Sequence, residues 1–200
     1  MCTLELKKIV TGVYGGSFNP IHNGHTAMAS EMVRRGIVDE MWLVVSPQNP
    51  LKTEGLWDDD FRLALARTAV ADAEGVYVSD VEFGLPRPNY MIVTLETLSA
   101  RFPDREFVLV IGRDNWERFC RWYRWRDILR MYRVVVLPRS TGGCNGVEMP
   151  EASAAGVVFA DVPLVDLSST WIRSEIQDNP VYDGEGLCPE VWRMIKGRFR

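Results

Sequence analysis

Six short apolar runs rich in β-branched residues recur along the 200-residue chain, separated by segments with helical spacing. The runs cover residues 9–13, 41–45, 76–78, 107–111, 134–137 and 157–159. They are continuous rather than alternating, which is typical of strands buried on both faces. Such strands alternating with helices predict a Rossmann-like α/β fold, an open parallel sheet with helices on both faces. We expect a single domain over residues 1–200, because no repeat or obvious linker interrupts the pattern.

Three segments between these runs have the apolar spacing of helices. Residues 25–35 carry apolar side chains on one face and stop at Gly36, a plausible C-cap. Residues 61–73 follow three aspartates, which suit a helix start, and residues 90–101 place Ile92, Leu95 and Leu98 on one face. Residues 140–146 are expected to form a surface loop.

Composition excludes several classes of protein. Hydrophobic residues make up 46% and charged residues 25% of the chain, and the net charge is −4, so the basic surplus of a nucleic-acid binder is absent. No apolar run reaches the ~18–20 residues of a membrane span. The four cysteines are scattered without a CxxC pair, which argues against a zinc site or a disulfide framework. We therefore expect a cytoplasmic protein that binds neither nucleic acid nor membrane.

Residues 15–25, GGSFNPIHNGH, contain both histidines and lie between the first expected strand and the first expected helix. A helix N-terminus at this edge of a parallel sheet suits a phosphate, and Gly15 and Gly16 allow the backbone to approach a ligand. His22 and His25, three residues apart, share one face and can each donate a hydrogen bond to phosphate oxygens. The string is neither a Walker P-loop nor a GxGxxG fingerprint. A glycine-rich turn with two surface histidines and a zinc-binding histidine pair are the alternatives.

The string resembles the HxGH signature of the nucleotidyltransferase superfamily. That resemblance implies that His22 and His25 contact the ATP phosphates and stabilise charge at the α-phosphate. Residues 167–173, LSSTWIR, resemble the ISSTxIR motif of the same superfamily, with Leu167 in place of Ile, although a helix N-cap is the simpler explanation for the hydroxyls. Arg173 would then bind phosphate through its planar fork. The implied catalytic residues are His22, His25 and Arg173, and the implied ATP-binding residues are Gly15, Gly16, Ser17, Phe18, Gly24, Gly112, Asp114, Arg139, Ser168, Ser169 and Thr170.

Residues 112–125 resemble the bacterial nicotinate-mononucleotide adenylyltransferases, in which a Trp stacks on the pyridine ring and the N–H of the next Tyr holds its carboxylate. The simpler explanations are core packing for the aromatics and a helix N-cap for Asp114. Near residue 90 the chain departs from the family pattern, with Asn89 in place of Ser and Met91 in place of Thr. The implied acceptor-binding residues are Asn19, Lys52, Tyr90, Met91, Thr94, Trp122 and Tyr123.

The resemblance predicts ATP-dependent transfer of AMP to nicotinate mononucleotide, a step in NAD biosynthesis. ATP is a substrate, and Mg²⁺ is expected to be bound mainly through phosphates, without a protein metal site. Three alternatives stay open: a nicotinamide-mononucleotide adenylyltransferase, a phosphopantetheine adenylyltransferase and a non-catalytic nucleotide-binding homologue. The sequence leaves homo-oligomerisation open.

Overall fold

The computed structural model describes residues 7–48, 55–138, 156–163, 165 and 167–199. Within these residues, six strands form one sheet in the order β3-β2-β1-β4-β5-β6. Every neighbouring pair in this order is parallel. The strands are β1 (Ile9–Gly16), β2 (Glu40–Val45), β3 (Val76–Ser79), β4 (Arg105–Gly112), β5 (Arg133–Leu137) and β6 (Val157–Phe159). The strand order reverses direction between β1 and β4, which is where open α/β sheets bind ligands.

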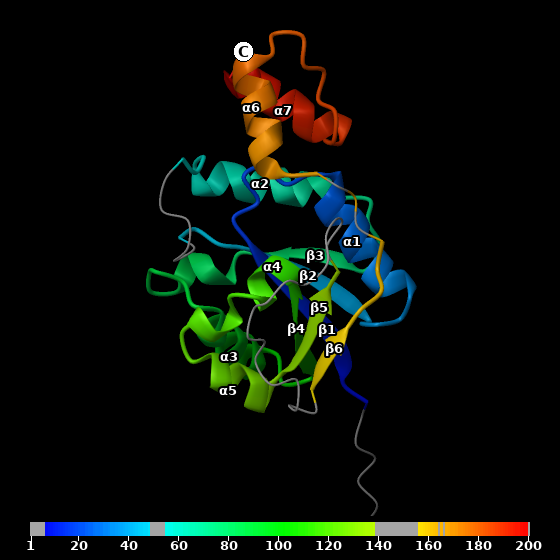
Figure 1. Ribbon diagram of the computed structural model, residues 1–200, viewed down its shortest axis with the longest axis vertical. Helices are drawn as coiled ribbons and strands as arrows, with labels where there is room; N and C mark the ends of the chain where they lie inside the picture. Colours follow the sequence, from blue (N-terminus) through cyan, green and yellow to red (C-terminus); the bar gives the residue numbers. More distant parts are fainter. Residues whose placement is uncertain (1–6, 49–54, 139–155, 164, 166, 200) are drawn as a thin grey trace, which may run out of the picture.

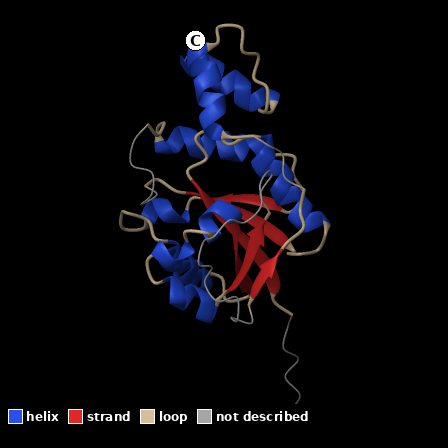
Figure 2. Cartoon of the chain, in the orientation of Figure 1, coloured by secondary structure: helices blue, strands red, loops and turns tan. Residues whose placement is uncertain are grey.

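Helices connect the strands and cover both faces of the sheet (Figures 1 and 2). The α-helices are α1 (Asn23–Arg34), α2 (Asp59–Ala69), α3 (Met91–Arg101), α4 (Arg113–Trp116), α5 (Trp125–Met131), α6 (Ser169–Asp178) and α7 (Pro189–Phe199). Two short 3₁₀ helices, η1 (Val81–Gly84) and η2 (Phe119–Arg121), precede α3 and α5. Figure 1 places α6 and α7 together at one end of the molecule, beyond α2. No helix of the described residues has the length and apolar character needed to cross a membrane.

Two apolar clusters fill the space on the two sides of the sheet. One joins the sheet to buried residues of α1, α2, α6 and α7, and the other joins it to α3, α4 and α5. Consecutive residues of β4 divide between them: Val108 and Val110 belong to the first cluster, and Phe107, Leu109 and Ile111 to the second. A strand with both faces buried has no reason to alternate with polar residues, which explains its continuous apolar run.

The predicted fold class is confirmed, and each predicted strand coincides with an observed one. The three predicted helices also form; one end coincides with the prediction, at Arg101, and the other ends differ by one to four residues. Gly36, just beyond α1, has a φ of 66°, the left-handed conformation expected after a helix end. The expected loop at 140–146 lies outside the described residues.

Arg62 of α2 is fully buried, and its guanidinium joins several segments at the carboxyl edge of the sheet. It donates hydrogen bonds only to backbone carbonyls and one carboxylate: Ser17 O, Ser46 O (2.9 Å), Trp57 O (3.0 Å), Pro47 O (3.3 Å) and Asp59 Oδ1 (2.6 Å). These acceptors lie after β1, after β2 and at the start of α2. One buried cation therefore fixes the two loops that border the ligand-binding edge.

Replacing Arg62 with Met should destabilise the fold strongly. The change leaves several buried carbonyls without their donor, and loss of one partner of a buried ionic network typically costs about 3–5 kcal/mol. The measurement is the free energy of unfolding from urea denaturation. Arg67→Met is the matched control, because Arg67 lies on the same helix with 56% of its side chain exposed and pairs with Asp80 at 2.8 Å. The control should lose less than about 1 kcal/mol; equal losses in the two variants would contradict the structural role of Arg62.

Candidate active site

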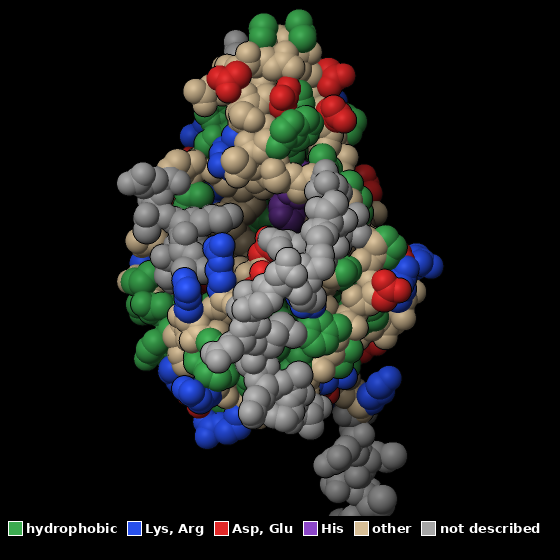
Figure 3. Space-filling model, viewed as in Figure 1, with side chains coloured by type: hydrophobic (Ala, Val, Ile, Leu, Met, Phe, Trp, Pro, Cys, Tyr) green, Lys and Arg blue, Asp and Glu red, His purple; other side chains and the backbone are tan. Residues whose placement is uncertain are grey.

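The segment after β1 brings both histidines to the N-terminus of α1. His22 is the N-cap residue of this helix, with an extended backbone conformation, and His25 follows in the first turn. The His22 N–H donates to Nδ1 of His25 at 3.2 Å. The two rings stack with centroids 3.7 Å apart and planes 28° apart. Figure 3 shows a histidine side chain at the bottom of a hollow on the surface. The pair thus sits where the unpaired N–H groups of the helix favour an anion.

His22 is neutral at pH 7 in this structure. Its side chain is buried, and burial lowers the pKa from 6.5 to about 4. Its Nδ1 is buried and has no hydrogen-bond partner among the described residues. Because the rings stack so closely, a positive charge on both imidazoles would be unfavourable without a bound anion. The pair is therefore set up to respond to an incoming negative charge.

Two neighbouring residues explain how the ring of His22 is held. A Cβ at Gly24 would lie only 3.0 Å from Nδ1 of His22, so a side chain at this position would displace the ring. Phe18 is buried with its ring edge-on to His25, at a centroid distance of 5.0 Å. The Phe18 side chain therefore supports the histidine pair by packing. Only the backbone of Phe18 has polar groups that could contact a phosphate.

The N-terminal part of α6 docks on the same loop. The Ser169 hydroxyl donates to Pro20 O at 2.8 Å, and the Arg173 guanidinium donates to Asn19 O at 2.7 Å. Ser168 caps the helix by accepting a hydrogen bond from the Trp171 N–H at 3.1 Å. The structure thus brings the second motif against the first, and the capping explanation holds for Ser168.

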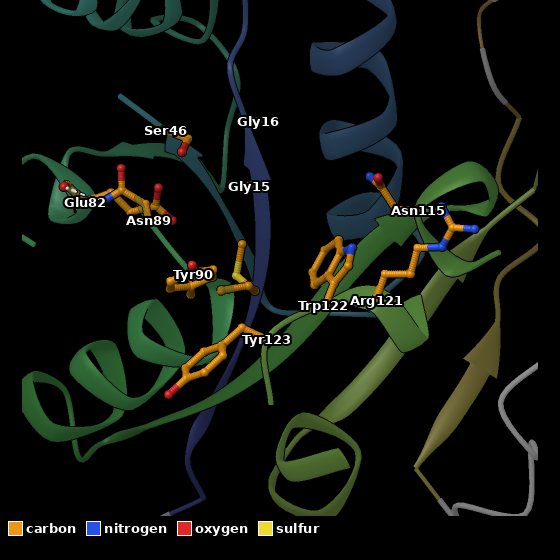
Figure 4. Close-up of a pocket in the computed structure, with 11 residues that line it drawn as sticks. Gly15, Gly16, Ser46, Glu82, Asn89, Tyr90, Asn115, Arg121, Trp122 and Tyr123 are labelled. Atoms are coloured by element: carbon orange, nitrogen blue, oxygen red, sulfur yellow. Dashed lines mark hydrogen bonds between the residues drawn. The ribbon is translucent and has the colours of Figure 1, made fainter. Parts of the chain in front are cut away.

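A cavity of about 690 Å³, open to solvent, lies beside this loop. It extends from the carboxyl end of β1 to the segments around η1, α3, α4 and η2 (Figure 4). The residues that line it are Gly15, Gly16, Ser46, Glu82, Asn89, Tyr90, Met91, Asn115, Arg121, Trp122 and Tyr123. Gly15 and Gly16 connect this cavity to the histidine loop, so a ligand in it would lie next to a phosphate bound at α1.

Aromatic side chains and one thioether form part of the cavity wall. The rings of Tyr90 and Tyr123 lie with centroids 4.7 Å apart, and Trp122 lines the cavity beside them. A Cβ at Gly15 would lie 2.4 Å from Cε of Met91. Glycine at this position therefore makes room for the methionine, a role different from the backbone approach to ligand expected from the sequence.

Another part of the lining is polar. Glu82 is 2% exposed, and Thr94 donates to its Oε1 at 2.7 Å, while Oε2 has no hydrogen-bond partner among the described residues. Burial raises the pKa of Glu82, and the hydroxyls of Ser46 and Thr94 oppose that shift. Asn89 donates to Glu82 O at 3.1 Å and accepts from the Gln48 N–H at 3.2 Å. Asn89, which replaces a family Ser, therefore ties the loop after β2 to η1.

Several predicted site residues lie elsewhere than the cavity wall. Asn19 is buried, and its side chain donates to Gly55 O at 2.9 Å and accepts from the Trp57 N–H at 3.0 Å, so it supports the loop. Thr94 is fully buried with its hydroxyl on Glu82. Lys52 and Arg139 lie outside the described residues. The other predicted acceptor-binding residues line the cavity, namely Tyr90, Met91, Trp122 and Tyr123.

Asp114 lies within α4, whose N-cap is Gly112, so the capping alternative for Asp114 is wrong. Its carboxylate is exposed and raises the pKa of the Tyr14 hydroxyl, second to the effect of burial. Asp114 is thus an exposed residue of α4, just after the end of β4.

Five residues that line the cavity were missing from the predicted set: Ser46, Glu82, Asn89, Asn115 and Arg121. The sequence carries one usable signal for Glu82, a lone acid between Val81 and Phe83. For Arg121 the signal is an arginine directly before Trp122. Ser46 and Asn115 give no comparable signal, because Ser46 follows a strand like many ordinary loop residues and Asn115 lies within the short helix α4.

Comparison with known families and proteins agrees with this geometry. The model of the cytidylyltransferase-like family matches residues 13–175, which include both motifs and the cavity. The chain belongs to the cytidylyltransferase-like family. A protein of Bacteroides thetaiotaomicron named probable nicotinate-nucleotide adenylyltransferase is 41% identical over 198 residues, which are 98% of this chain and 95% of that protein. A Flavobacterium johnsoniae protein of the same name is 37% identical over 92% of this chain and 94% of its own length.

Solved structures of this family share the fold. The nicotinic acid mononucleotide adenylyltransferase of Plasmodium falciparum, complexed with NaAD, superposes with a TM-score of 0.75 at 15% identity. The alignment covers 95% of this chain and 96% of that one. At this identity the likeness establishes the architecture, and the site must be argued from the residues of this chain.

The described residues contain no group of three or more His, Cys, Asp or Glu side chains that could hold a metal ion. The two histidines stack on each other at the helix start instead of converging on a common point with a third ligand.

We expect the imidazole of His22 to titrate with a midpoint near pH 4 in the unliganded protein. Because the unfolded state binds this proton first, the stability contributed by the neutral ring is lost as the pH falls from about 6.5 toward 4. Adding pyrophosphate should raise the midpoint, since a nearby anion favours the imidazolium. NMR titration measures the midpoint of His22 without and with pyrophosphate, and the His22→Asn variant assigns the signals of the two histidines. A midpoint near 6.5 without ligand would contradict the burial of His22.

Proposed function

We propose that this chain transfers the AMP group of ATP to nicotinate mononucleotide, producing nicotinate adenine dinucleotide and pyrophosphate. The observation that carries the proposal is the position of an aromatic-lined cavity next to a helix N-terminus that bears two stacked histidines. Nearly end-to-end similarity to proteins named nicotinate-nucleotide adenylyltransferase supports the same acceptor.

The triphosphate of ATP would bind across the N-termini of α1 and α6. Both helices are long enough to present unpaired N–H groups, and Ser169 in the first turn of α6 donates to Pro20 O in the loop that leads to α1. His22 and His25 would donate hydrogen bonds to phosphate oxygens. Arg173 donates to Asn19 O, Ser169 O and the Thr170 hydroxyl, so only the donors left over would face the phosphates. Asp114 would accept a hydrogen bond from a ribose hydroxyl.

The acceptor would occupy the cavity with its pyridine ring against Trp122. A flat indole face suits a planar heterocycle. Backbone N–H groups at Tyr123 and Met91 would face the ring carboxylate, and Tyr90 would close the same side. The acceptor phosphate would then lie on the side of Trp122 away from Tyr123, in a cavity that Gly15 and Gly16 connect to the histidine loop.

The chemical step is an in-line displacement at phosphorus. An oxygen of the acceptor phosphate forms a bond to the α-phosphorus of ATP while the bond to the β-phosphate oxygen breaks and pyrophosphate leaves. The two histidines and the helix dipoles would stabilise the charge that develops on the α- and β-phosphate oxygens. Positioning and charge neutralisation account for the rate, and no covalent protein intermediate is needed.

Mg²⁺ fits the site as an ion held chiefly by phosphate oxygens and water, since the described residues offer no dedicated carboxylate cluster. Bound in this way, it supplies charge neutralisation on the nucleotide. The protein residues named above orient the two substrates around it.

Nicotinamide mononucleotide is the second candidate acceptor. The reason to test it is Met91, which replaces a threonine of the family. Its thioether lies against Gly15 at the cavity wall, where the family usually has a threonine hydroxyl. Loss of that hydroxyl removes a polar group on which a carboxylate could rely, while the backbone N–H of Met91 can still donate.

We expect nicotinate mononucleotide to be preferred over nicotinamide mononucleotide by roughly 10²-fold or more in kcat/KM. With N–H donors on both sides of the substituent, a carboxamide leaves one donor unpaired, and about 2.7 kcal/mol of discrimination gives this factor. The measurement is pyrophosphate release from ATP with each mononucleotide and with phosphopantetheine.

The outcomes separate the candidates clearly. Equal kcat/KM values for the two mononucleotides would indicate dual specificity, and Met91→Thr should then restore preference for the acid. Release only with phosphopantetheine would refute the proposed acceptor. Binding of ATP without release in any mixture would identify a nucleotide-binding protein without turnover.

His25→Ala should lower turnover by about 10²–10³-fold, the usual cost of losing one donor to developing charge. The fold should survive, because His25 is only half-buried and begins a helix whose core contacts are Met28, Ala29 and Met32. Thr26→Ala is the control, since its hydroxyl bonds only Asn23 O, at 3.2 Å. Normal turnover of folded His25→Ala protein would remove His25 from the mechanism.

A further inference from the structure

Among the described residues that line the cavity, one side chain is cationic and one is acidic, namely Arg121 and Glu82. Glu82 is almost fully buried with a raised pKa, which favours its neutral form. Arg121 is exposed, so its guanidinium keeps its charge at the mouth of the cavity. A cavity for an anionic acceptor thus has a single described cation on its wall.

Two arginines that follow Arg121 in the chain are engaged in ion pairs. Arg124 pairs with Glu96 at 2.9 Å and with Asp127 at 2.7 Å, and Arg130 pairs with Asp127 at 2.9 Å. Within the described part of the chain, Arg121 forms neither an ion pair nor a hydrogen bond through its side chain. Its planar fork is therefore available to a ligand.

Asn115 lies on the same part of the cavity wall as Arg121. In Figure 4 both side chains lie on one side of Trp122, and Tyr123 lies on the other. The Asn115 amide also makes no hydrogen bond within the described part of the chain. An arginine fork next to an amide is a typical arrangement for binding phosphate oxygens.

We propose that Arg121, assisted by Asn115, binds the phosphate of the mononucleotide acceptor and so determines the affinity for that substrate. This inference rests on the proposed function. A pyridine ring on Trp122 with its carboxylate toward Tyr123 directs the ribose phosphate to the opposite side, where Arg121 and Asn115 lie. The same contact orients the phosphate that attacks ATP.

The test compares Arg121→Gln with wild type by steady-state kinetics, using nicotinate and nicotinamide mononucleotides in turn. We expect kcat/KM for each acceptor to fall by about 10–100-fold through a higher KM, the range for losing a hydrogen bond to a charged group. The KM for ATP should change less than about two-fold, and Arg121→Lys should be intermediate, since it keeps the charge without the fork. Binding of nicotinate riboside, which lacks the phosphate, should be equal in wild type and variant by calorimetry.

Arg118→Gln is the matched control. Arg118 is also exposed, lies three residues earlier, forms no ion pair within the described part of the chain and does not line the cavity. It should behave like wild type. A similar loss in both variants would indicate a general electrostatic effect and overturn the inference.

Three further results would also overturn it: unchanged kinetics in Arg121→Gln, a loss confined to the nicotinate acceptor, which would assign Arg121 to the carboxylate, or a loss confined to ATP. Failure of the proposed function has a different signature, namely a wild-type protein that releases no pyrophosphate with either mononucleotide.

Discussion

The buried guanidinium of Arg62 is the interaction on which the geometry of the site depends. The histidine loop begins at Ser17 and the loop after β2 begins at Ser46, and the carbonyls of both residues accept from this one side chain. Asn19 then connects the histidine loop to the segment before α2, and Arg173 connects it to α6. The order of dependence is therefore from the sheet edge to Arg62, from Arg62 to the loop, and from the loop to the two histidines. Packing alone would leave these loops without the directional contacts that fix catalytic side chains.

The sequence was sufficient to predict the sheet, because burial on both faces leaves short continuous apolar runs, and their length and β-branched residues favour strands over buried helices. Helix ends were less predictable. The second helix was expected to reach residue 73 but ends at Ala69, and Val70 to Ala73 pack as a turn before β3. Val70 and Ala73 are still buried or partly buried and Ala71 is exposed, so the composition of the segment resembles that of a helix although the backbone differs. The spacing of apolar residues therefore predicts which residues are buried better than it predicts where helical hydrogen bonds end.

The site was predictable to the extent that its chemistry lies in contiguous motifs. His22, His25, Ser168 to Arg173, and Trp122 with Tyr123 all fall in such strings. Glu82, Asn115 and Arg121 line the same cavity but come from separate segments, and their common location follows only from the folded chain. Asn19 is a different case. It lies inside a recognisable motif, but its side chain hydrogen-bonds Gly55 O and the Trp57 N–H and so supports the loop. Motif membership therefore locates a residue near the chemistry without specifying its contact.

Before substrate binds, the site carries few positively charged side chains for a protein that is proposed to hold ATP together with a second phosphate. His22 is neutral because it is buried, and burial likewise favours the neutral form of Glu82. Among the described side chains of the cavity wall Arg121 is the one cation, and Arg173, at the histidine loop, already donates to Asn19 O. Helix N-termini supply the rest as dipoles, which attract anions without repelling one another when the site is empty. Such a site avoids the self-repulsion of a permanent cation cluster. Because burial lowers the pKa of His22, its imidazole gains a proton near neutral pH only where a nearby anion favours the imidazolium. Under the proposed function, phosphate binding and protonation of His22 would therefore favour each other.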